Sequence, residues 1–172
     1  MAEDPPFHRS DYLLGPRAAG AEVVMKRTTQ ADADILGPAI TSMEPWARLG
    51  LSAEQMIGFL AGSNENLRCF SIWHGGDRAG VAVVRFPWLS GPYLNLLAVL
   101  PAFQHKGLGC AVLSWMETEA LAAGARNCFL CVSAFNTGAH AFYRWNGYAC
   151  ATMLHDLIKD GEDEILMRKR LR

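Results

Sequence analysis

Two glycines that follow an apolar run are the residues best suited to ligand chemistry in this sequence. Gln104, Gly107 and Gly109 form the pattern Q-x-x-G-x-G, and Pro101 separates this pattern from the apolar residues 94–100. Because neither glycine carries a Cβ atom, an anion can closely approach the backbone N–H groups. A helix that begins here also favours negative charge at its N-terminus. The pattern therefore predicts a phosphate-binding loop.

Two familiar phosphate-binding loops do not fit this segment. A P-loop has Lys and then Ser or Thr after its second glycine, and the chain contains no such sequence. The dinucleotide fingerprint needs a third Gly or Ala where Val112 stands. The loop is therefore expected to bind a different phosphate ligand.

A second pattern follows at residues 136–148 and contains, in order, Asn136, Ala139, Phe142-Tyr143 and Gly147-Tyr148. Together the two patterns resemble the GNAT superfamily of acyl-CoA dependent N-acyltransferases. The phosphate-binding signature of that superfamily is Gln or Arg, two residues, Gly, one residue, then Gly or Ala. Its later pattern is N-x-x-A-x-x, an apolar residue, Tyr, three residues, Gly and then Phe or Tyr. The resemblance spans residues 23–171, and residues 97–148 carry its specific motifs.

The resemblance implies that acetyl-CoA is the cosubstrate and that no metal takes part. In this superfamily the fourth and fifth strands splay apart near their ends, and the pantetheine arm of acyl-CoA lies between them as a substitute strand. These strands are expected at residues 93–99 and 127–132. Lys106 adds positive charge close to the phosphates. The implied cofactor-binding residues are Leu97, Ala98, Val99, Gln104, His105, Lys106, Gly107, Leu108, Gly109, Cys110, Asn136, Ala139 and Tyr143.

The resemblance also implies that Tyr143 is the general acid that protonates the departing coenzyme A thiolate. A phenol with an ordinary pKa of about 10 is protonated at neutral pH and is able to donate to a thiolate of similar basicity. The acceptor amine is expected to attack the thioester directly, without a covalent enzyme intermediate. The Val99 backbone is expected to stabilise the tetrahedral oxyanion.

A general base is harder to find, because the two expected cleft strands carry no carboxylate. Cys131 stands about where family members that acetylate protein N-termini have a glutamate. Glu44, between two expected helices, and His74, at a strand end, are the candidate bases. Alternatively, Tyr93 and Asn95 position a water molecule that relays the proton.

Aromatic residues form a candidate acceptor site for a small amine, a peptide N-terminus or a lysine side chain. Core packing or a dimer contact is the alternative explanation of these side chains, and Trp88-Leu89 points to self-association. The oligomeric state is therefore expected to be a monomer or a homodimer. The candidate acceptor residues are Trp46, Phe86, Trp88 and Tyr93, with Met43 beside them.

Hydrophobic periodicity and turn signals predict the elements that position these residues. Helices are expected after Thr29 and Ser52, at the glycine loop and near Asn136. The order of elements predicts a mixed α/β (α+β) domain with helices on a central sheet. The resemblance makes this a mostly antiparallel, twisted sheet of about seven strands with a splayed cleft and about four helices. Strands are expected at residues 23–27, 67–74, 81–86, 93–99, 127–132, 149–157 and 164–170.

Composition limits the domain count and the partners. The chain has 172 residues, of which 51% are hydrophobic and 19% are charged, and this composition favours one globular domain at residues 22–172. Residues 1–21, which are rich in Pro and Gly, are expected to form a flexible arm. The 16 Lys and Arg nearly balance the 17 Asp and Glu, so no nucleic acid or membrane partner is expected.

Cysteine usage and the first residues favour a cytoplasmic protein. The chain has five cysteines, an odd number, in apolar segments, and its first 21 residues contain no hydrophobic leader. Cys128 and Cys131 form C-x-x-C, but on a strand they point to opposite faces, which argues against a redox or metal site.

Two hypotheses about function remain. The first is an N-acetyltransferase that moves an acetyl group from acetyl-CoA to a primary amine. The alternative is a catalytically silent module that binds or senses acyl-CoA, which the missing strand carboxylates favour and Tyr143 disfavours.

Overall fold

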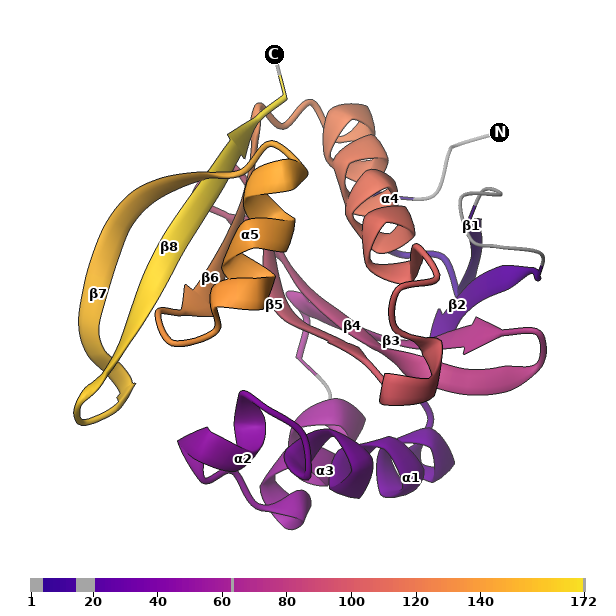
Figure 1. The fold of residues 1–172 in the computed structure, drawn as a ribbon. Helices are drawn as coiled ribbons and strands as arrows, with labels where there is room; N and C mark the ends of the chain where they lie inside the picture. Colours follow the sequence, from indigo (N-terminus) through magenta and orange to yellow (C-terminus); the bar gives the residue numbers. More distant parts are fainter. Residues whose placement is uncertain (1–4, 15–20, 63, 172) are drawn as a thin grey trace.

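A computed structural model describes residues 5–14, 21–62 and 64–171 (Figure 1). The helices are α1 (Gln30–Thr41), α2 (Trp46–Leu49), α3 (Ala53–Ala61), α4 (Leu108–Ala122) and α5 (Thr137–Trp145), and a 3-10 turn lies at Pro101–Phe103. The strands are β1 (Asp11–Leu14), β2 (Val23–Arg27), β3 (Leu67–His74), β4 (Asp77–Trp88), β5 (Gly91–Val99), β6 (Asn127–Ser133), β7 (Ala149–Lys159) and β8 (Glu162–Arg170). None of the described helices is both long and apolar enough to cross a bilayer.

The strands form one eight-stranded sheet in the order β1-β2-β3-β4-β5-β6-β8-β7. Neighbouring strands are antiparallel except β5 and β6, which are parallel. These two strands pair only at Tyr93 with Phe129 and at Leu94 with Leu130, and then separate. The mixed, mostly antiparallel fold and its splayed strand pair are confirmed.

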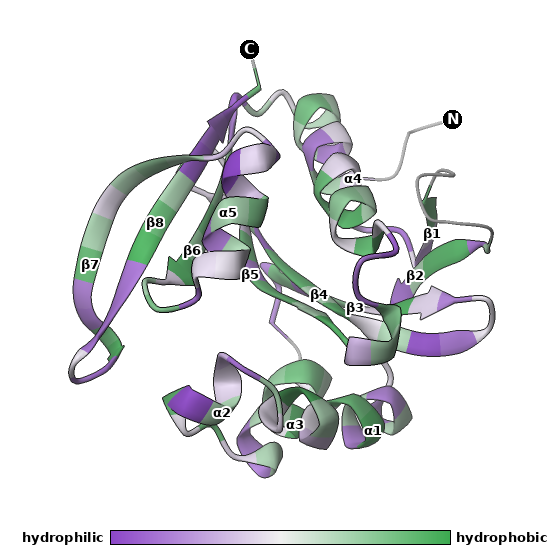
Figure 2. Ribbon diagram, viewed as in Figure 1, coloured by the Kyte–Doolittle hydropathy of each residue, from purple (hydrophilic) through white to green (hydrophobic). Residues whose placement is uncertain are grey.

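Helices cover both faces of the sheet: α1, α2 and α3 lie on one side and α4 and α5 on the other (Figure 1). Successive side chains of β4 alternate between the two cores. Val81 and Val83 pack in the core under α1 and α3, whereas Ala82 and Val84 pack in the core under α4. Strands buried on both faces are continuously apolar, and Figure 2 shows this colouring along β4 and β5.

Local capping signals place the helix ends where the sequence predicts them. Thr29 and Ser52 each form a capping box at the start of α1 and α3. Gly147 follows α5 with a φ of 88°, a left-handed conformation that favours glycine and ends the helix. The capping box of α1 is also tied to the sheet, because Arg78 Nε on β4 lies 2.6 Å from Asp32 Oδ1.

The structure differs from the sequence expectation near the N-terminus. Within the expected arm, β1 pairs with β2, and Phe7 is only 1% exposed, with its ring edge-to-face against Trp115 of α4. Burial of these side chains orders the segment, which is too short to show periodicity in the sequence. Residues 1–4 and 15–20 of the expected arm lie outside the described residues. The sequence predicts about seven strands and about four helices, and β1 and the short helix α2 are the additional strand and helix.

Candidate active site

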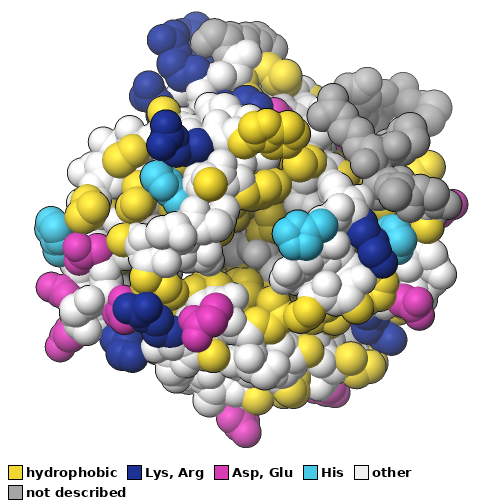
Figure 3. All heavy atoms as spheres, viewed as in Figure 1, with side chains coloured by type: hydrophobic (Ala, Val, Ile, Leu, Met, Phe, Trp, Pro, Cys, Tyr) yellow, Lys and Arg dark blue, Asp and Glu magenta, His cyan; other side chains and the backbone are white. Residues whose placement is uncertain are grey.

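A cavity of about 750 Å³ opens where β5 and β6 separate. Figure 3 shows it as a hollow in the middle of one face, with hydrophobic side chains around it. Its walls come from the α1–α2 connection, β5, the start of α4, β6, α5 and the β7–β8 hairpin. Segments that lie between Met43 and Glu164 in the sequence therefore meet at this one site.

The glycine loop forms one end of the cavity. Gly107 has a φ of 83° and occupies the N-cap position of α4, where no side chain caps the helix. The first N–H groups of α4 are therefore free of a side-chain cap and face an anion-binding position. A Cβ atom on Gly109 would lie 2.9 Å from Cζ of Phe142, so a side chain there would force α4 or the Phe142 ring of α5 to move.

The free edge of β5 forms the floor of the cavity between the glycine loop and Tyr143, the candidate general acid. Leu97 and Val99 line the cavity, whereas Ala98 is 1% exposed and packs in the core on the other face, as strand alternation requires. Leu100 donates its N–H to Ala79 O on the β4 side at 2.8 Å. The Val99 N–H, one residue earlier, therefore points to the opposite edge, toward the cleft.

The other predicted cofactor-binding residues are mostly brought together. Lys106 does not line the cavity, and its Nζ lies 5.2 Å from the centre of the Phe103 ring. Asn136 caps α5 by accepting the Ala139 N–H at 3.1 Å, so its side-chain oxygen already has a structural partner. The predicted residues in the walls are Leu97, Val99, Gln104, His105, Gly107, Leu108, Gly109, Cys110, Asn136, Ala139 and Tyr143.

Tyr143 projects from α5 into the cavity wall and is 8% exposed. Burial raises the pKa of Tyr143 above its ordinary value, so the phenol is protonated at neutral pH. Among the described residues, no hydrogen-bond partner of the Tyr143 hydroxyl is found. The proton is therefore not committed to another protein group.

The two candidate bases lie in different places. Glu44 lines the cavity from the α1–α2 connection and is exposed. His74 does not line the cavity; its ring packs edge-to-face against Phe103, with 5.9 Å between the ring centres, and its Nε2 is buried without a hydrogen-bond partner. Of the pair proposed as water-positioning residues, both Tyr93 and Asn95 line the cavity.

The predicted acceptor residues separate into two groups. Trp46 and Tyr93 line the cavity, together with Met43, whereas Phe86 and Trp88 do not. Phe86 packs against Phe7 in the core with 5.2 Å between ring centres. Trp88 lies against Tyr93 with 4.7 Å between the ring centres, so it contacts a wall residue without lining the cavity itself.

A buried carboxylate in the cavity wall is missing from the sequence prediction. Glu164 of β8 is 3% exposed and accepts a 2.5 Å hydrogen bond from the Ser133 hydroxyl of β6, its partner in the strand register. Burial raises the pKa of Glu164, against which the Ser133 hydrogen bond acts. In the sequence Glu164 ends the acidic run 162–164, which has the composition of a solvated hairpin. Only the register of β8 against β6 shows that it turns inward.

Cys131 lines the cavity with its thiol near Tyr93. Burial raises the pKa of both Cys131 and Tyr93. Cys128 lies in the core under α4, and burial raises the pKa of its thiol to about 12. The two cysteines of C-x-x-C thus lie in different environments, as strand alternation predicts.

Comparison with known proteins identifies the class. The model of the acetyltransferase (GNAT) family matches residues 35–148. The chain therefore belongs to this family, and it is an acyltransferase of the GNAT type. No curated protein sequence matches it.

Solved structures share the fold over most of the chain. A GNAT-family acetyltransferase from Desulfovibrio desulfuricans is 21% identical, with a TM-score of 0.69, and the match covers 87% of this chain and 99% of that one. The ribosomal-protein-S18-alanine N-acetyltransferase from Escherichia coli is 23% identical, with a TM-score of 0.69 and coverage of 87% and 94%. The PaiA N-acetyltransferase from Thermoplasma acidophilum in complex with coenzyme A is 19% identical, with a TM-score of 0.66 and coverage of 86% and 98%.

Proposed function

We propose that this protein transfers the acetyl group of acetyl-CoA to a primary amine by direct attack within a ternary complex. The observation that carries this proposal is the position of Tyr143: its phenol lines the same cavity as the start of α4 and the free edge of β5. An anion site, an unpaired strand edge and an uncommitted proton donor are the three features that acyl-CoA chemistry needs.

In this proposal the diphosphate of acetyl-CoA binds at the N-terminus of α4, around Gly107 and Gly109. The amides of pantetheine bond to the free edge of β5 at Leu97 and Val99, where β6 has moved away. This path directs the thioester toward Tyr143. The acceptor then enters from the side walled by Trp46 and Tyr93.

Acetyl transfer begins when the amine nitrogen attacks the thioester carbon. The Val99 N–H, which points into the cleft, donates a hydrogen bond to the oxyanion that develops on the carbonyl oxygen. The bond between carbon and sulfur then breaks, and the Tyr143 hydroxyl donates its proton to the thiolate. Because burial raises the pKa of Tyr143, the phenol is still protonated when the thiolate forms beside it.

The test is the substitution Tyr143→Phe, which removes only the hydroxyl. We expect coenzyme A release to slow by about 100-fold or more, with acetyl-CoA affinity by calorimetry nearly unchanged. Tyr148→Phe is the matched control, because Tyr148 is buried outside the cavity walls with its hydroxyl 3.4 Å from Glu117 Oε1.

The assay uses 2-phenylethylamine, polyamines, lysine and peptide N-termini as acceptors. A Tyr143→Phe variant that keeps full turnover would refute the role of the phenol. Tight acetyl-CoA binding without thiol release from any acceptor would instead identify a binding or sensing module.

A further inference from the structure

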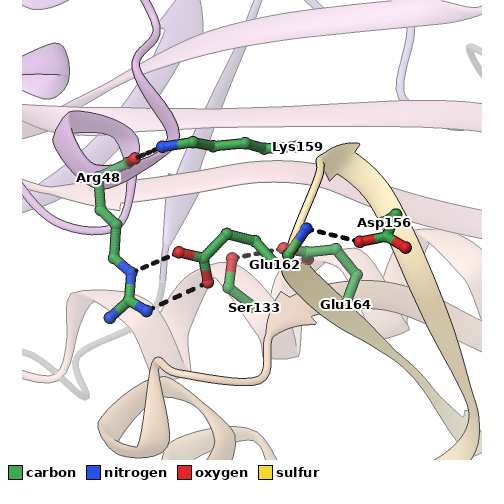
Figure 4. A network of polar contacts seen from close by, with 7 residues as sticks. Arg48, Ser133, Asp156, Lys159, Glu162 and Glu164 are labelled. Carbon is green, nitrogen blue, oxygen red and sulfur yellow. Dashed lines mark hydrogen bonds and ion pairs between the residues drawn. The ribbon is translucent and has the colours of Figure 1, made fainter.

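Glu164 is a buried carboxylate in the wall of the cavity near Tyr93. The part of the cavity walled by Trp46, Tyr93 and Glu164 is called the acceptor end below. Strands β6 and β8 together fix the position of the Glu164 side chain. It lies on β8 directly opposite Ser133 of β6, whose hydroxyl donates to Glu164 Oε1 at 2.5 Å. Figure 4 shows the pair behind the contact between Arg48 and Glu162. A carboxylate that is only 3% exposed normally requires a compensating partner.

The part of the protein that the structure describes supplies no cation to this carboxylate. Among the described residues, no Lys, Arg or His forms an ion pair with Glu164. Its neighbours on other elements are neutral: Ser133 and Cys131 of β6 and Tyr93 of β5. On its own strand, Glu162 adds a negative charge nearby.

Two other carboxylates of the molecule, in contrast to Glu164, form ion pairs with arginine. Glu162 lies 2.8 Å from Arg48 Nε, and the buried Asp32 lies 2.6 Å from Arg78 Nε. Each of these charges is neutralised by a side chain of the same chain. Glu164, which is as deeply buried as Asp32, is instead open to the cavity.

The charge of the cavity walls also favours a cationic acceptor. Glu44 and Glu164 are the carboxylates in the cavity walls, and no Lys or Arg is present in the described part of these walls. Such a surface attracts an ammonium group and repels a carboxylate. Trp46 and Tyr93 add aromatic faces, which also favour a cation.

We propose that Glu164 binds the acceptor's ammonium group and takes its proton, and that the acceptor is a primary amine without a neighbouring carboxylate. This inference rests on the proposed acetyl transfer and adds the general base and the acceptor class. Burial strengthens the base, because it raises the pKa of Glu164 above its ordinary value.

The proton balance is complete with Glu164 and Tyr143 alone. Of the three ammonium protons, one passes to the Glu164 carboxylate and then to solvent. The free amine forms the carbon–nitrogen bond, and the carbon–sulfur bond breaks as Tyr143 protonates the thiolate. A second proton leaves the nitrogen and restores the Tyr143 phenol. The third stays on the amide product.

The first experiment compares Glu164→Gln with wild type, using acetyl-CoA and 2-phenylethylamine. We expect kcat/KM at neutral pH to fall by about 100-fold or more, with an unchanged affinity for acetyl-CoA. Part of the loss is recovered at alkaline pH, where free amine is abundant. Asp163→Asn is the control, because the adjacent Asp163 points away from the cavity and contacts His155 at 3.0 Å.

A second variant, Ser133→Ala, tests the same group without removing it. Loss of the Ser133 hydrogen bond, which lowers the pKa of Glu164, should move the acidic limb of the pH–rate profile to higher pH. A purely structural role of Ser133 would lower the rate at every pH equally and would overturn the assignment.

The acceptor class is tested with phenylalaninamide and phenylalanine, which share an amine and an aromatic body and differ in the carboxylate. We expect the amide to be preferred by about tenfold or more in kcat/KM, after each value is corrected for the fraction of free amine at the assay pH. Equal rates for the two compounds would overturn the acceptor class.

The outcomes separate this inference from the proposed function. If wild type transfers acetyl groups and Glu164→Gln does so within about threefold with the same pH profile, the inference fails and the function stands. If wild type transfers to no amine, the function fails. Calorimetry of 2-phenylethylammonium binding to the coenzyme A complex then decides the Glu164 site. Binding at least about tenfold weaker in Glu164→Gln supports the site, and equal binding overturns it.

Discussion

Gly109 shows how a single missing atom shapes the cofactor end of the site. Its α-carbon faces the ring of Phe142, and a Cβ atom would lie 2.9 Å from Cζ of that ring. With the Phe142 ring in this position, the start of α4 lies this close to α5 because Gly109 has no side chain. The position of the N–H groups at the phosphate site depends on the same contact.

We expect Gly109→Ala to weaken acetyl-CoA binding by about tenfold, or about 1.4 kcal/mol, because the packed Phe142 ring resists displacement and α4 shifts instead. The second substitution Phe142→Leu removes the obstructing ring carbon and should restore part of the affinity. Calorimetry with acetyl-CoA measures both effects.

Gly58→Ala is the matched control, because a Cβ atom at Gly58 meets nothing within 4 Å. This variant should therefore bind acetyl-CoA with unchanged affinity. Because Gly58 lies inside α3 and alanine is the better helix former, its free energy of unfolding should rise slightly. Unchanged acetyl-CoA binding by Gly109→Ala would contradict the packing explanation.

Among the contacts between secondary-structure elements, the ion pair of Asp32 with Arg78 connects α1 to the sheet. Asp32 Oδ2 accepts hydrogen bonds from the Thr29 backbone N–H at 3.0 Å and hydroxyl at 2.8 Å, while Oδ1 contacts Arg78 of β4. Burial by itself raises the pKa of Asp32, but these contacts outweigh it and hold the pKa below its ordinary value. The folded state therefore stabilises the ionised carboxylate.

We expect Asp32→Ala to lower the free energy of unfolding at neutral pH by about 3 kcal/mol, because Arg78 and the helix N-terminus lose their partner. A lowered pKa gives stability that is present above the ordinary pKa and lost as the pH falls through the folded value. The difference from wild type should therefore shrink below about pH 4. Urea denaturation of both proteins at neutral pH and below about pH 4 measures this difference in the free energy of unfolding.

Asp34→Ala is the control for this helix, since Asp34 is exposed and, within the described residues, its carboxylate is hydrogen-bonded only to the Gln30 side chain, at 2.7 Å. Its effect should be within about 0.5 kcal/mol. An Asp32→Ala difference that stays constant down to acid pH would rule out the ionised carboxylate as the source of stability.

Across the whole molecule, Arg48 joins the layer of α1 to α3 to the far end of the sheet. Its guanidinium contacts Glu162 of β8 at 2.8 Å, and its carbonyl accepts a 2.8 Å hydrogen bond from Lys159 Nζ (Figure 4). The guanidinium also lies 4.1 Å above the centre of the Phe135 ring. Two segments joined in this way, α2 and the β7–β8 hairpin, contribute Trp46 and Ile158 to the cavity walls.

Arg48→Ala should therefore raise the KM for the acceptor by about fivefold and leave the affinity for acetyl-CoA unchanged. The Arg48 side chain is 49% exposed, so the free energy of unfolding should change by less than about 1 kcal/mol. Steady-state kinetics with 2-phenylethylamine and urea denaturation separate the two effects. A proportional loss of acetyl-CoA affinity would show that the contact supports the whole cavity rather than its acceptor end.

The sequence by itself determined the features that depend on neighbouring residues. The capping boxes at Thr29 and Ser52, the strand periods and the loop around Gly107 follow from contacts within a few residues, and all are found in the structure. The family resemblance, which the family match confirms, added the separation of β5 from β6, a relation between distant segments that no local pattern contains.

Only the tertiary structure decided which distant side chains meet. It brought Glu164 into the cavity through the register of β8 against β6, placed Phe86 and His74 outside the walls, and buried Phe7 against α4. A shift of one residue in strand register would turn Glu164 to the other face, and no property of the acidic run 162–164 specifies that register. The chemistry of a side chain is a property of the residue itself, whereas its burial and its contact partners are set by packing between distant segments.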